Sequence, residues 1–292
     1  QRRTLRHEIR FQRFGHEVFP REFRVGQFAH HGAQVEDACD AVDIAAWYPH
    51  AEPHETTRED RKEILSLVEE NGLEVNQLVG SASFAAALPV YEIRKGFLQG
   101  QINRLNLASD LNAKNMETLP GQLRPEFSKE VSWEWVLDTF KEMADHAERV
   151  GVPIALEYEP YLGQKMWGHK TPLTVSTLQE LRQMVDDVNS EYFKANLDLG
   201  HCYISGASKE DFKMLGDDIV STHINDNDGK EDLNDVPGTW NAPFEEYFRW
   251  LDDVGYDGYI GVELEGSKKI DEEAVESYEY LKNMLDELGL YG

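Results

Sequence analysis

The chain has 292 residues, of which 29 are Lys or Arg and 55 are Asp or Glu, so its net charge is −26 at neutral pH. Hydrophobic residues make up 40% of the chain and aromatic residues 11%, which excludes a disordered polypeptide. No apolar run approaches the roughly 18–20 residues of a membrane helix. An acidic surface repels phosphate backbones and anionic lipids, so we expect no nucleic acid and no membrane as a partner.

Residues 1–24 differ in charge from the rest of the chain. They carry seven Arg and three Glu, whereas the remainder is strongly acidic. We expect residues 1–22 to be an N-terminal extension that folds back on the acidic body or on a neighbouring subunit. A homo-oligomer is therefore the expected assembly, with a hetero-oligomer as the alternative.

The two cysteines, Cys39 and Cys202, are too few for a disulfide framework, and no CxxC or zinc-finger spacing is present. Sparse cysteines are typical of proteins in reducing compartments. We therefore expect a cytoplasmic location.

From residue 23 onward, short apolar runs of β type alternate with longer amphipathic stretches of helical period. The apolar runs predict eight strands, at residues 24–30, 42–48, 74–80, 103–109, 153–158, 193–199, 219–225 and 258–264. The amphipathic stretches predict helices at residues 57–71, 132–150, 174–188, 208–215, 242–253 and 271–288, with less regular ones at 34–40 and 84–100.

Strands that alternate with helices form a parallel sheet with helices on its faces. Eight such repeats predict a single α/β domain over residues 23–292, a closed (β/α)8 TIM barrel. An open doubly wound sheet is the alternative, but the chain lacks the glycine-rich nucleotide motifs of such sheets. The long segments 110–131 and 159–173 are expected to be βα loops on the carboxyl face, where barrel active sites lie.

A potential metal ligand stands near the end of each of the last four predicted strands. These residues are Glu157, Asp198, His223 and Glu263. Neighbouring parallel strands lie about 4.8 Å apart, so the four side chains can converge at the mouth of the barrel. Three carboxylates and one imidazole suit one divalent cation. Mn²⁺ is the first expectation, with Mg²⁺, Co²⁺ and Zn²⁺ as alternatives.

The ligand candidates lie in four motifs, ALEYEP, NLDLGH, HINDND and GVELEG. In this combination the sequence resembles the xylose isomerase-like TIM barrels of the sugar phosphate isomerase/epimerase superfamily, over about residues 23–290. The resemblance implies that Glu157, Asp198, His223 and Glu263 bind one divalent metal. It also implies that His201, three residues after Asp198, contacts the substrate or takes part in catalysis.

The endonuclease IV type of DNA repair enzyme belongs to the same superfamily and binds three zinc ions, one of them through a D-x-H pair. The corresponding stretch here is Asp232–Leu233–Asn234, in which asparagine replaces the histidine. Asparagine is a poor zinc ligand. Together with the net charge of −26, this difference argues against DNA repair.

A divalent metal can bind two adjacent oxygens of a hydroxy-ketone and stabilise the enediolate formed when the neighbouring carbon loses its proton. In the ketose epimerases of this superfamily the matching glutamates are ligands and also the acid/base pair, which implies these roles for Glu157 and Glu263. We therefore expect an isomerase or epimerase of a sugar or polyol ketone. The alternatives are a lyase with the same first step, such as an inosose dehydratase or C-glycoside deglycosidase subunit, and a non-catalytic metal-stabilised subunit.

Further residues at the predicted mouth are candidates for substrate contact. His30 ends the first predicted strand, Trp47 lies near the end of the second, and Trp167 lies in the loop after the fifth. With His201, they complete the predicted substrate-binding set. The mouth has no obvious arginine cluster or glycine-rich phosphate loop, which favours a sugar or polyol without phosphate.

Overall fold

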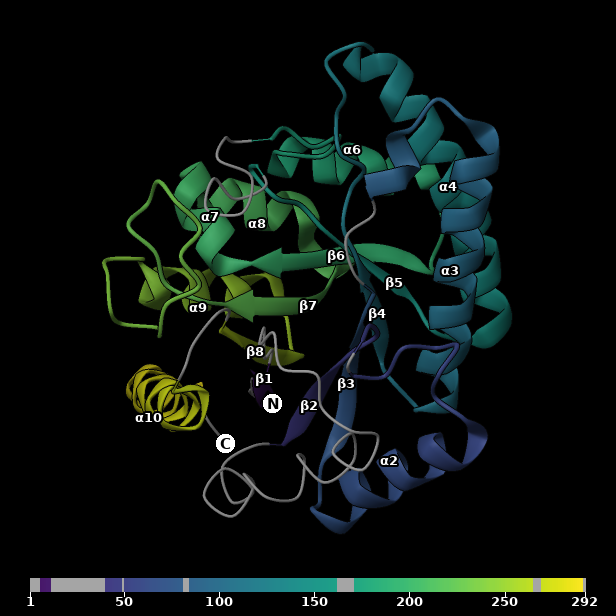
Figure 1. Cartoon of the computed structure of the whole chain (residues 1–292). Helices are drawn as coiled ribbons and strands as arrows, with labels where there is room; N and C mark the ends of the chain where they lie inside the picture. Colours follow the sequence, from purple (N-terminus) through teal and green to yellow (C-terminus); the bar gives the residue numbers. More distant parts are fainter. Residues whose placement is uncertain are drawn as a thin grey trace.

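The chain folds into a barrel of parallel strands (Figure 1). The barrel has eight strands in sequence order and is closed, because the first strand pairs with both the second and the eighth. The computed structural model describes residues 6–11, 40–48, 50–80, 84–161, 171–264 and 269–290, the first of these ranges as backbone. The strands are β1 (Arg6–Phe11), β2 (Ala41–Ala45), β3 (Glu74–Val79), β4 (Asn115–Thr118), β5 (Ile154–Glu157), β6 (Phe193–Asp198), β7 (Ile219–Ile224) and β8 (Tyr259–Leu264). The predicted (β/α)8 barrel is confirmed.

Helices follow the strands and surround the barrel (Figure 1). They are α2 (Arg58–Glu70), α3 (Tyr91–Asp110), α4 (Lys129–Val150), α6 (Leu178–Val188), α7 (Leu199–Ser205), α8 (Lys209–Leu215), α9 (Phe244–Val254) and α10 (Ile270–Leu288), with short 3-10 turns η2 (Phe84–Ala87) and η3 (Gly216–Asp218). Within the described ranges, no helix combines the length and apolar character that crossing a membrane requires.

Local sequence explains where these helices begin and end. Thr57 caps α2 by accepting a hydrogen bond from the Asp60 backbone N–H, while the Asp60 carboxylate accepts one from the Thr57 backbone N–H. Helix α4 ends at Gly151, whose φ of 75° lies in the left-handed region that glycine adopts without steric cost.

The strand predicted at residues 103–109 is wrong. These residues lie inside α3, and the fourth strand is β4, a few residues later. Leu105 and Leu107 alternate as strand residues do, but Leu98, Leu105 and Ala108 form a buried face of helical period. Strand β4, with the sequence NMET, carries no apolar alternation because it turns polar side chains toward the barrel interior.

The first strand also differs from the prediction. Strand β1 lies within residues 1–22, where we expected an extension, and it pairs with β8 from Arg6↔Tyr259 to Phe11↔Leu264. Residues 6–11 are therefore part of the barrel. The reason is that closing an eight-stranded sheet requires a strand between β2 and β8, and this backbone pairing overrides the charged composition that suggested an extension. The strand predicted at 24–30 lies outside the described residues.

The strands of the barrel turn apolar side chains outward, toward the helices, and polar side chains inward, toward the barrel interior. Between strands and helices lies an apolar layer in which Phe140 of α4 meets Phe193 of β6, with ring centroids 5.1 Å apart. Inside the barrel, by contrast, Gln77, Asn115 and Ser221 are buried, and Gln77 donates hydrogen bonds to the other two. The outer layer supplies the hydrophobic core, and the interior is left to a hydrogen-bonded network.

Replacing Phe140 with alanine is expected to lower the free energy of unfolding by about 3–5 kcal/mol, because it leaves a cavity beside Phe193. Urea unfolding followed by circular dichroism measures this change. Phe127→Ala is the matched control, since Phe127 is 38% exposed and its truncation removes less buried surface. Equal losses in both variants would contradict this description of the core.

Candidate metal centre

Four predicted ligands meet at the carboxyl end of the barrel. Glu157 and Asp198 are the last residues of β5 and β6, while His223 and Glu263 lie near the ends of β7 and β8. Strand pairing places Asp198 opposite His223. All four side chains are buried, and one ligand atom from each lies within 4.8 Å of the others. The fold thus brings together the residues that the sequence suggested as ligands.

His223 lies at the middle of this cluster. Its Nδ1 is 2.7 Å from Glu157 Oε2 and 3.3 Å from Glu263 Oε2. The side chain of Asn196, two residues before Asp198, reaches the same point and donates a hydrogen bond from Nδ2 to Glu157 Oε2. Ring nitrogen and carboxylate oxygens therefore face one shared volume.

The chemistry of the donors fits a divalent cation. Three carboxylates buried this close together repel one another unless positive charge offsets them. Within the described residues, the ion pairs of Glu157 and Asp198 are all with histidines. Burial raises the pKa of Asp198 to about 7, and the neighbouring Glu157 and Glu263 add to the rise, which His201 opposes. Oxygen donors with one imidazole suit Mn²⁺, Mg²⁺, Co²⁺ or Zn²⁺.

His201 lies beside the cluster on α7. The Asp198 carboxylate caps this helix and accepts a hydrogen bond of 2.6 Å from the His201 backbone N–H. The His201 ring contacts the Tyr158 carbonyl through Nδ1, at 3.0 Å, which makes Nδ1 the donor. Its Nε2 lies 3.7 Å from Asp232 Oδ2. Burial lowers the pKa of His201, but Asp198, Asp232 and Glu157 outweigh this effect and hold it well above the ordinary value.

Gly200 allows the support of Asp198 to pack closely. Asn225, just after β7, donates a hydrogen bond of 2.8 Å from Nδ2 to Asp198 Oδ2. A Cβ atom at position 200 would lie 2.0 Å from Asn225 Oδ1, which is far inside van der Waals contact. Only glycine therefore lets Asn225 reach and orient the Asp198 carboxylate.

The supporting residues Asn196, Asn225 and Asp232 were not predicted. Asn196 precedes Asp198 by two residues on β6, so the two share the inner face of that strand, and Asn225 follows His223 by two, one residue beyond the end of β7. That spacing was a usable signal. Asp232 lies in the irregular segment after β7, where no periodicity marks it.

Of the predicted substrate-contact residues, the structure describes Trp47 as well as His201. Trp47 is half-buried in the turn that follows β2, at the same end of the barrel as the ligand candidates. Its contact with a substrate stays a prediction. His30 and Trp167 lie outside the described residues.

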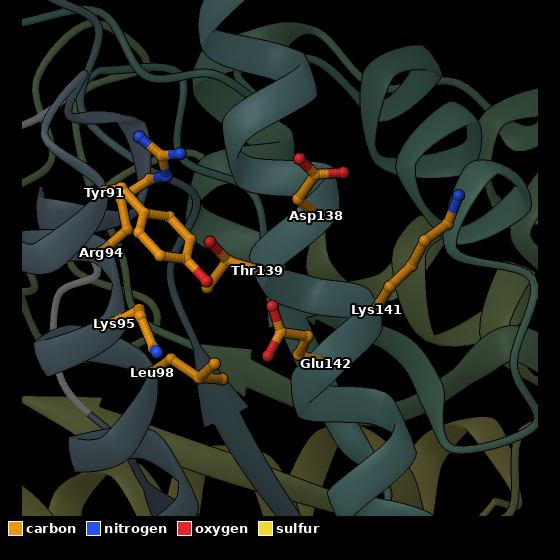
Figure 2. A pocket seen from close by; sticks show the side chains of 8 residues that line it. All are labelled: Tyr91, Arg94, Lys95, Leu98, Asp138, Thr139, Lys141 and Glu142. Carbon is orange, nitrogen blue, oxygen red and sulfur yellow. The ribbon is translucent and has the colours of Figure 1, made fainter.

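A separate pocket lies between the outer helices α3 and α4 (Figure 2). It is lined by Tyr91, Arg94, Lys95, Leu98, Asp138, Thr139, Lys141 and Glu142. Lys95 lies over the exposed Tyr91 ring, 5.3 Å from its centroid. The pocket contains none of the four ligand candidates.

Gly200→Ala is expected to weaken Co²⁺ binding about 10–100-fold, because displacing Asn225 leaves Asp198 without its orienting hydrogen bond. Isothermal titration calorimetry measures the affinity. Gly96→Ala in α3 is the matched control, since a Cβ there meets nothing within 4 Å. Unchanged affinity in Gly200→Ala would show that Asn225 does not support the site.

Solved structures of similar fold include a D-psicose 3-epimerase from Clostridium cellulolyticum H10 with D-tagatose. The TM-score is 0.75 at 19% identity, covering 96% of this chain and 99% of that chain. The chain is also similar to the IOLI protein with a bound zinc atom, with a TM-score of 0.72 at 20% identity, covering 90% of this chain and 93% of that chain. At these identities the likeness establishes the fold alone.

Curated relatives include an uncharacterised protein of Methanocaldococcus jannaschii, 31% identical over 61% of this chain and 59% of that protein. A fructoselysine 3-epimerase of Escherichia coli O157:H7 is 30% identical over 46% of each chain. An inosose isomerase of Bacillus subtilis is 27% identical over 57% of this chain and 60% of its own length. The match thus spans about half to three fifths of these relatives.

The family model for the xylose isomerase-like TIM barrel matches residues 33–284, which is most of the chain. The match includes β2 to β8 and all four residues of the buried cluster. The chain belongs to the xylose isomerase-like TIM barrel family.

Proposed function

We propose that this protein is a metal-dependent isomerase or epimerase of a sugar or polyol ketone. The observation that carries the proposal is the buried cluster of Glu157, Asp198, His223 and Glu263 at the carboxyl end of the barrel. Relatives named as a fructoselysine 3-epimerase and an inosose isomerase support the reaction class. Similarity to a zinc-binding protein of the same fold supports the metal.

The four side chains would hold one divalent cation, with Mn²⁺ first among the candidates. A bound divalent cation supplies Lewis acidity, which polarises a carbonyl and stabilises negative charge on neighbouring oxygens. The orientation of the Asp198 carboxylate is fixed, because Asn225 and the His201 backbone N–H each donate a hydrogen bond to one of its oxygens. Both donors restrict the rotation of the carboxylate.

Glu157 and Glu263 are proposed as the acid/base pair. They stand on β5 and β8, and His223 Nδ1 lies between their carboxylates at 2.7 Å and 3.3 Å. One carboxylate takes the proton from the carbon beside the substrate carbonyl, and the other returns a proton. Return on the opposite face of that carbon gives an epimer, and return to the adjacent carbon gives an isomer.

His201 is proposed to contact the substrate through Nε2. Its Nδ1 is engaged by the Tyr158 carbonyl, so Nε2, near Asp232, is the ring nitrogen left for a substrate oxygen. Glu157, Asp198, Glu263 and Asp232 make these surroundings acidic. Acidic surroundings favour a neutral, hydroxyl-rich substrate over a phosphorylated one. Trp47, Trp167 and His30 complete the proposed substrate contacts.

Glu263→Gln is expected to lower the rate of proton exchange about 10²–10⁴-fold, because an amide cannot accept the proton. The measurement is deuterium incorporation from D₂O into a panel of ketoses and inososes, read by mass spectrometry. Glu245→Gln, an exposed change on α9, is the matched control. Full exchange by Glu263→Gln with normal metal content would refute the mechanism.

The same experiment separates the reaction classes. Deuterium at the carbon next to the carbonyl, with the carbon skeleton and oxygens retained, supports an isomerase or epimerase. Loss of water or of an aglycone from the substrate identifies a lyase, the alternative reading of this site. No label with any substrate, in protein that contains metal, would favour a non-catalytic subunit.

Adding Mn²⁺ to chelator-treated protein is expected to restore activity and to raise the melting temperature. A ligand that binds only the folded state at about 100 times its Kd stabilises that state by about 2.7 kcal/mol. Differential scanning calorimetry with and without Mn²⁺ measures the shift. His223→Asn should abolish it, and an equal shift in that variant would place the metal elsewhere.

A further inference from the structure

Gln77 of β3 reaches across the barrel interior to the imidazole of His223 on β7. The Gln77 Oε1 atom lies 2.9 Å from His223 Nε2. On its other side, Gln77 Nε2 donates hydrogen bonds to Asn115 Oδ1 at 2.8 Å and to Ser221 Oγ at 3.0 Å. All four of these side chains are buried. A polar side chain from a distant strand thus contacts the ring nitrogen that faces away from the carboxylates.

The direction of these hydrogen bonds is set by a backbone carbonyl. Asn115 Nδ2 donates to the Asn76 carbonyl oxygen at 3.4 Å, and a carbonyl oxygen can only accept. Asn115 Oδ1 therefore faces Gln77 and receives the hydrogen bond from Gln77 Nε2. The Gln77 amide is thereby oriented with Oε1 toward His223, and turning it over would place two donors or two acceptors against each other.

This orientation determines which nitrogen of neutral His223 carries the proton. An amide oxygen accepts, so His223 Nε2 must be the N–H donor and Nδ1 must carry the lone pair. Asn196 supports the same assignment from the opposite side. Its Nδ2 donates to the Glu157 carboxylate, lies 3.1 Å from His223 Nδ1 and has a second hydrogen to donate to that nitrogen, for which the Glu157 carboxylate at 2.7 Å competes as an acceptor.

Asp43 of β2 adds a charge to the same side of the imidazole. Its Oδ2 is 3.9 Å from His223 Nε2 and has no hydrogen-bond partner among the described residues, while Oδ1 accepts from Asn76 Nδ2 at 3.1 Å. Asp43 is buried, so its negative charge is weakly screened. A carboxylate near Nε2 favours a proton on that nitrogen. Glu157 and Glu263, at 2.7 Å and 3.3 Å from Nδ1, act in the opposite direction, so the contact with Gln77 Oε1 is the one that assigns the proton to Nε2.

We propose that Gln77 is a positioning residue for the metal centre. Held by Asn115 and Ser221, it fixes His223 as the Nε2–H tautomer and aims the Nδ1 lone pair at the volume shared with Glu157 and Glu263. Groups that bond the remote nitrogen of a metal-binding histidine usually change metal affinity 10–100-fold when removed. This role rests on the proposed metal site.

The tautomer is measured directly, without metal, by long-range ¹H–¹⁵N correlation spectra of histidine-labelled protein, at a pH where imidazole is neutral. His223→Asn assigns the His223 signals. We expect the Nε2–H pattern in the unmodified protein and its loss, or a mixture of tautomers, in Gln77→Met, which removes Oε1 at similar volume. Nδ1–H in the unmodified protein would overturn the inference, whatever the variants do.

Two further variants separate this role from a structural one. Ser221→Ala removes one hydrogen bond of Gln77 but leaves Oε1 on His223, so the Nε2–H tautomer should persist. Gln77→Glu loses the donor that Asn115 Oδ1 and Ser221 Oγ receive, but it keeps an oxygen acceptor toward Nε2 and should also keep this tautomer, which provides a test if Gln77→Met does not fold. Loss of the tautomer in Ser221→Ala and Gln77→Glu alike would indicate general disruption of the interior and contradict the assignment.

Calorimetric titration with Co²⁺ then links the tautomer to metal binding. We expect Gln77→Met to bind Co²⁺ about 10–100-fold more weakly than the unmodified protein, and Ser221→Ala to bind it equally well. Unmodified protein that binds no Co²⁺ would refute the proposed metal site, even with His223 as the Nε2–H tautomer. Normal affinity in Gln77→Met with an altered tautomer would refute the positioning role alone.

Discussion

The mutual repulsion of three buried carboxylates is the constraint on which the rest of this structure depends. Glu157, Asp198 and Glu263 converge around the His223 imidazole, with ligand atoms within 4.8 Å of one another. Burial strengthens their repulsion and makes each charge costly, so the arrangement needs positive charge and many donors around it. Asn196 and Asn225 supply donors, since each directs an amide N–H at a carboxylate.

The polar interior of the barrel continues from this cluster, because Gln77 contacts His223. In many barrels of this class, branched apolar side chains fill the interior in layers. Here Gln77, Asn115 and Ser221 occupy it, and their hydrogen bonds join β3, β4 and β7. The hydrophobic core lies instead between strands and helices, where Phe140 packs on Phe193. Stability and site geometry are therefore supplied by different layers of the molecule.

The strands and ligand candidates of the second half of the chain could be predicted from the sequence more fully than the strands of the first half. Strands β5 to β8 are apolar runs that each admit a charged or imidazole side chain near the carboxyl end, so strand and ligand candidate were found together. Strand β4 has no alternation of apolar residues, because Asn115 faces the barrel interior. The strand was predicted instead in α3, where Leu105 and Leu107 alternate with polar residues. The basic charge of residues 1–24 led to the wrong prediction that residues 6–11 belong to an extension. Their position in the barrel depends on pairing with β8.

Contacts across the barrel could not be predicted from the sequence, because they join residues far apart in the chain. Gln77 and His223 are 146 residues apart, and no local period connects a glutamine in β3 with a histidine in β7. Closure of the sheet is what makes them neighbours, because it turns inner side chains of opposite strands toward one axis. Of the ligand candidates, His223 is thus contacted by residues of the first half, Gln77 and Asp43. The proposed metal centre therefore depends on β3 as well as on the four strands that carry its candidate ligands.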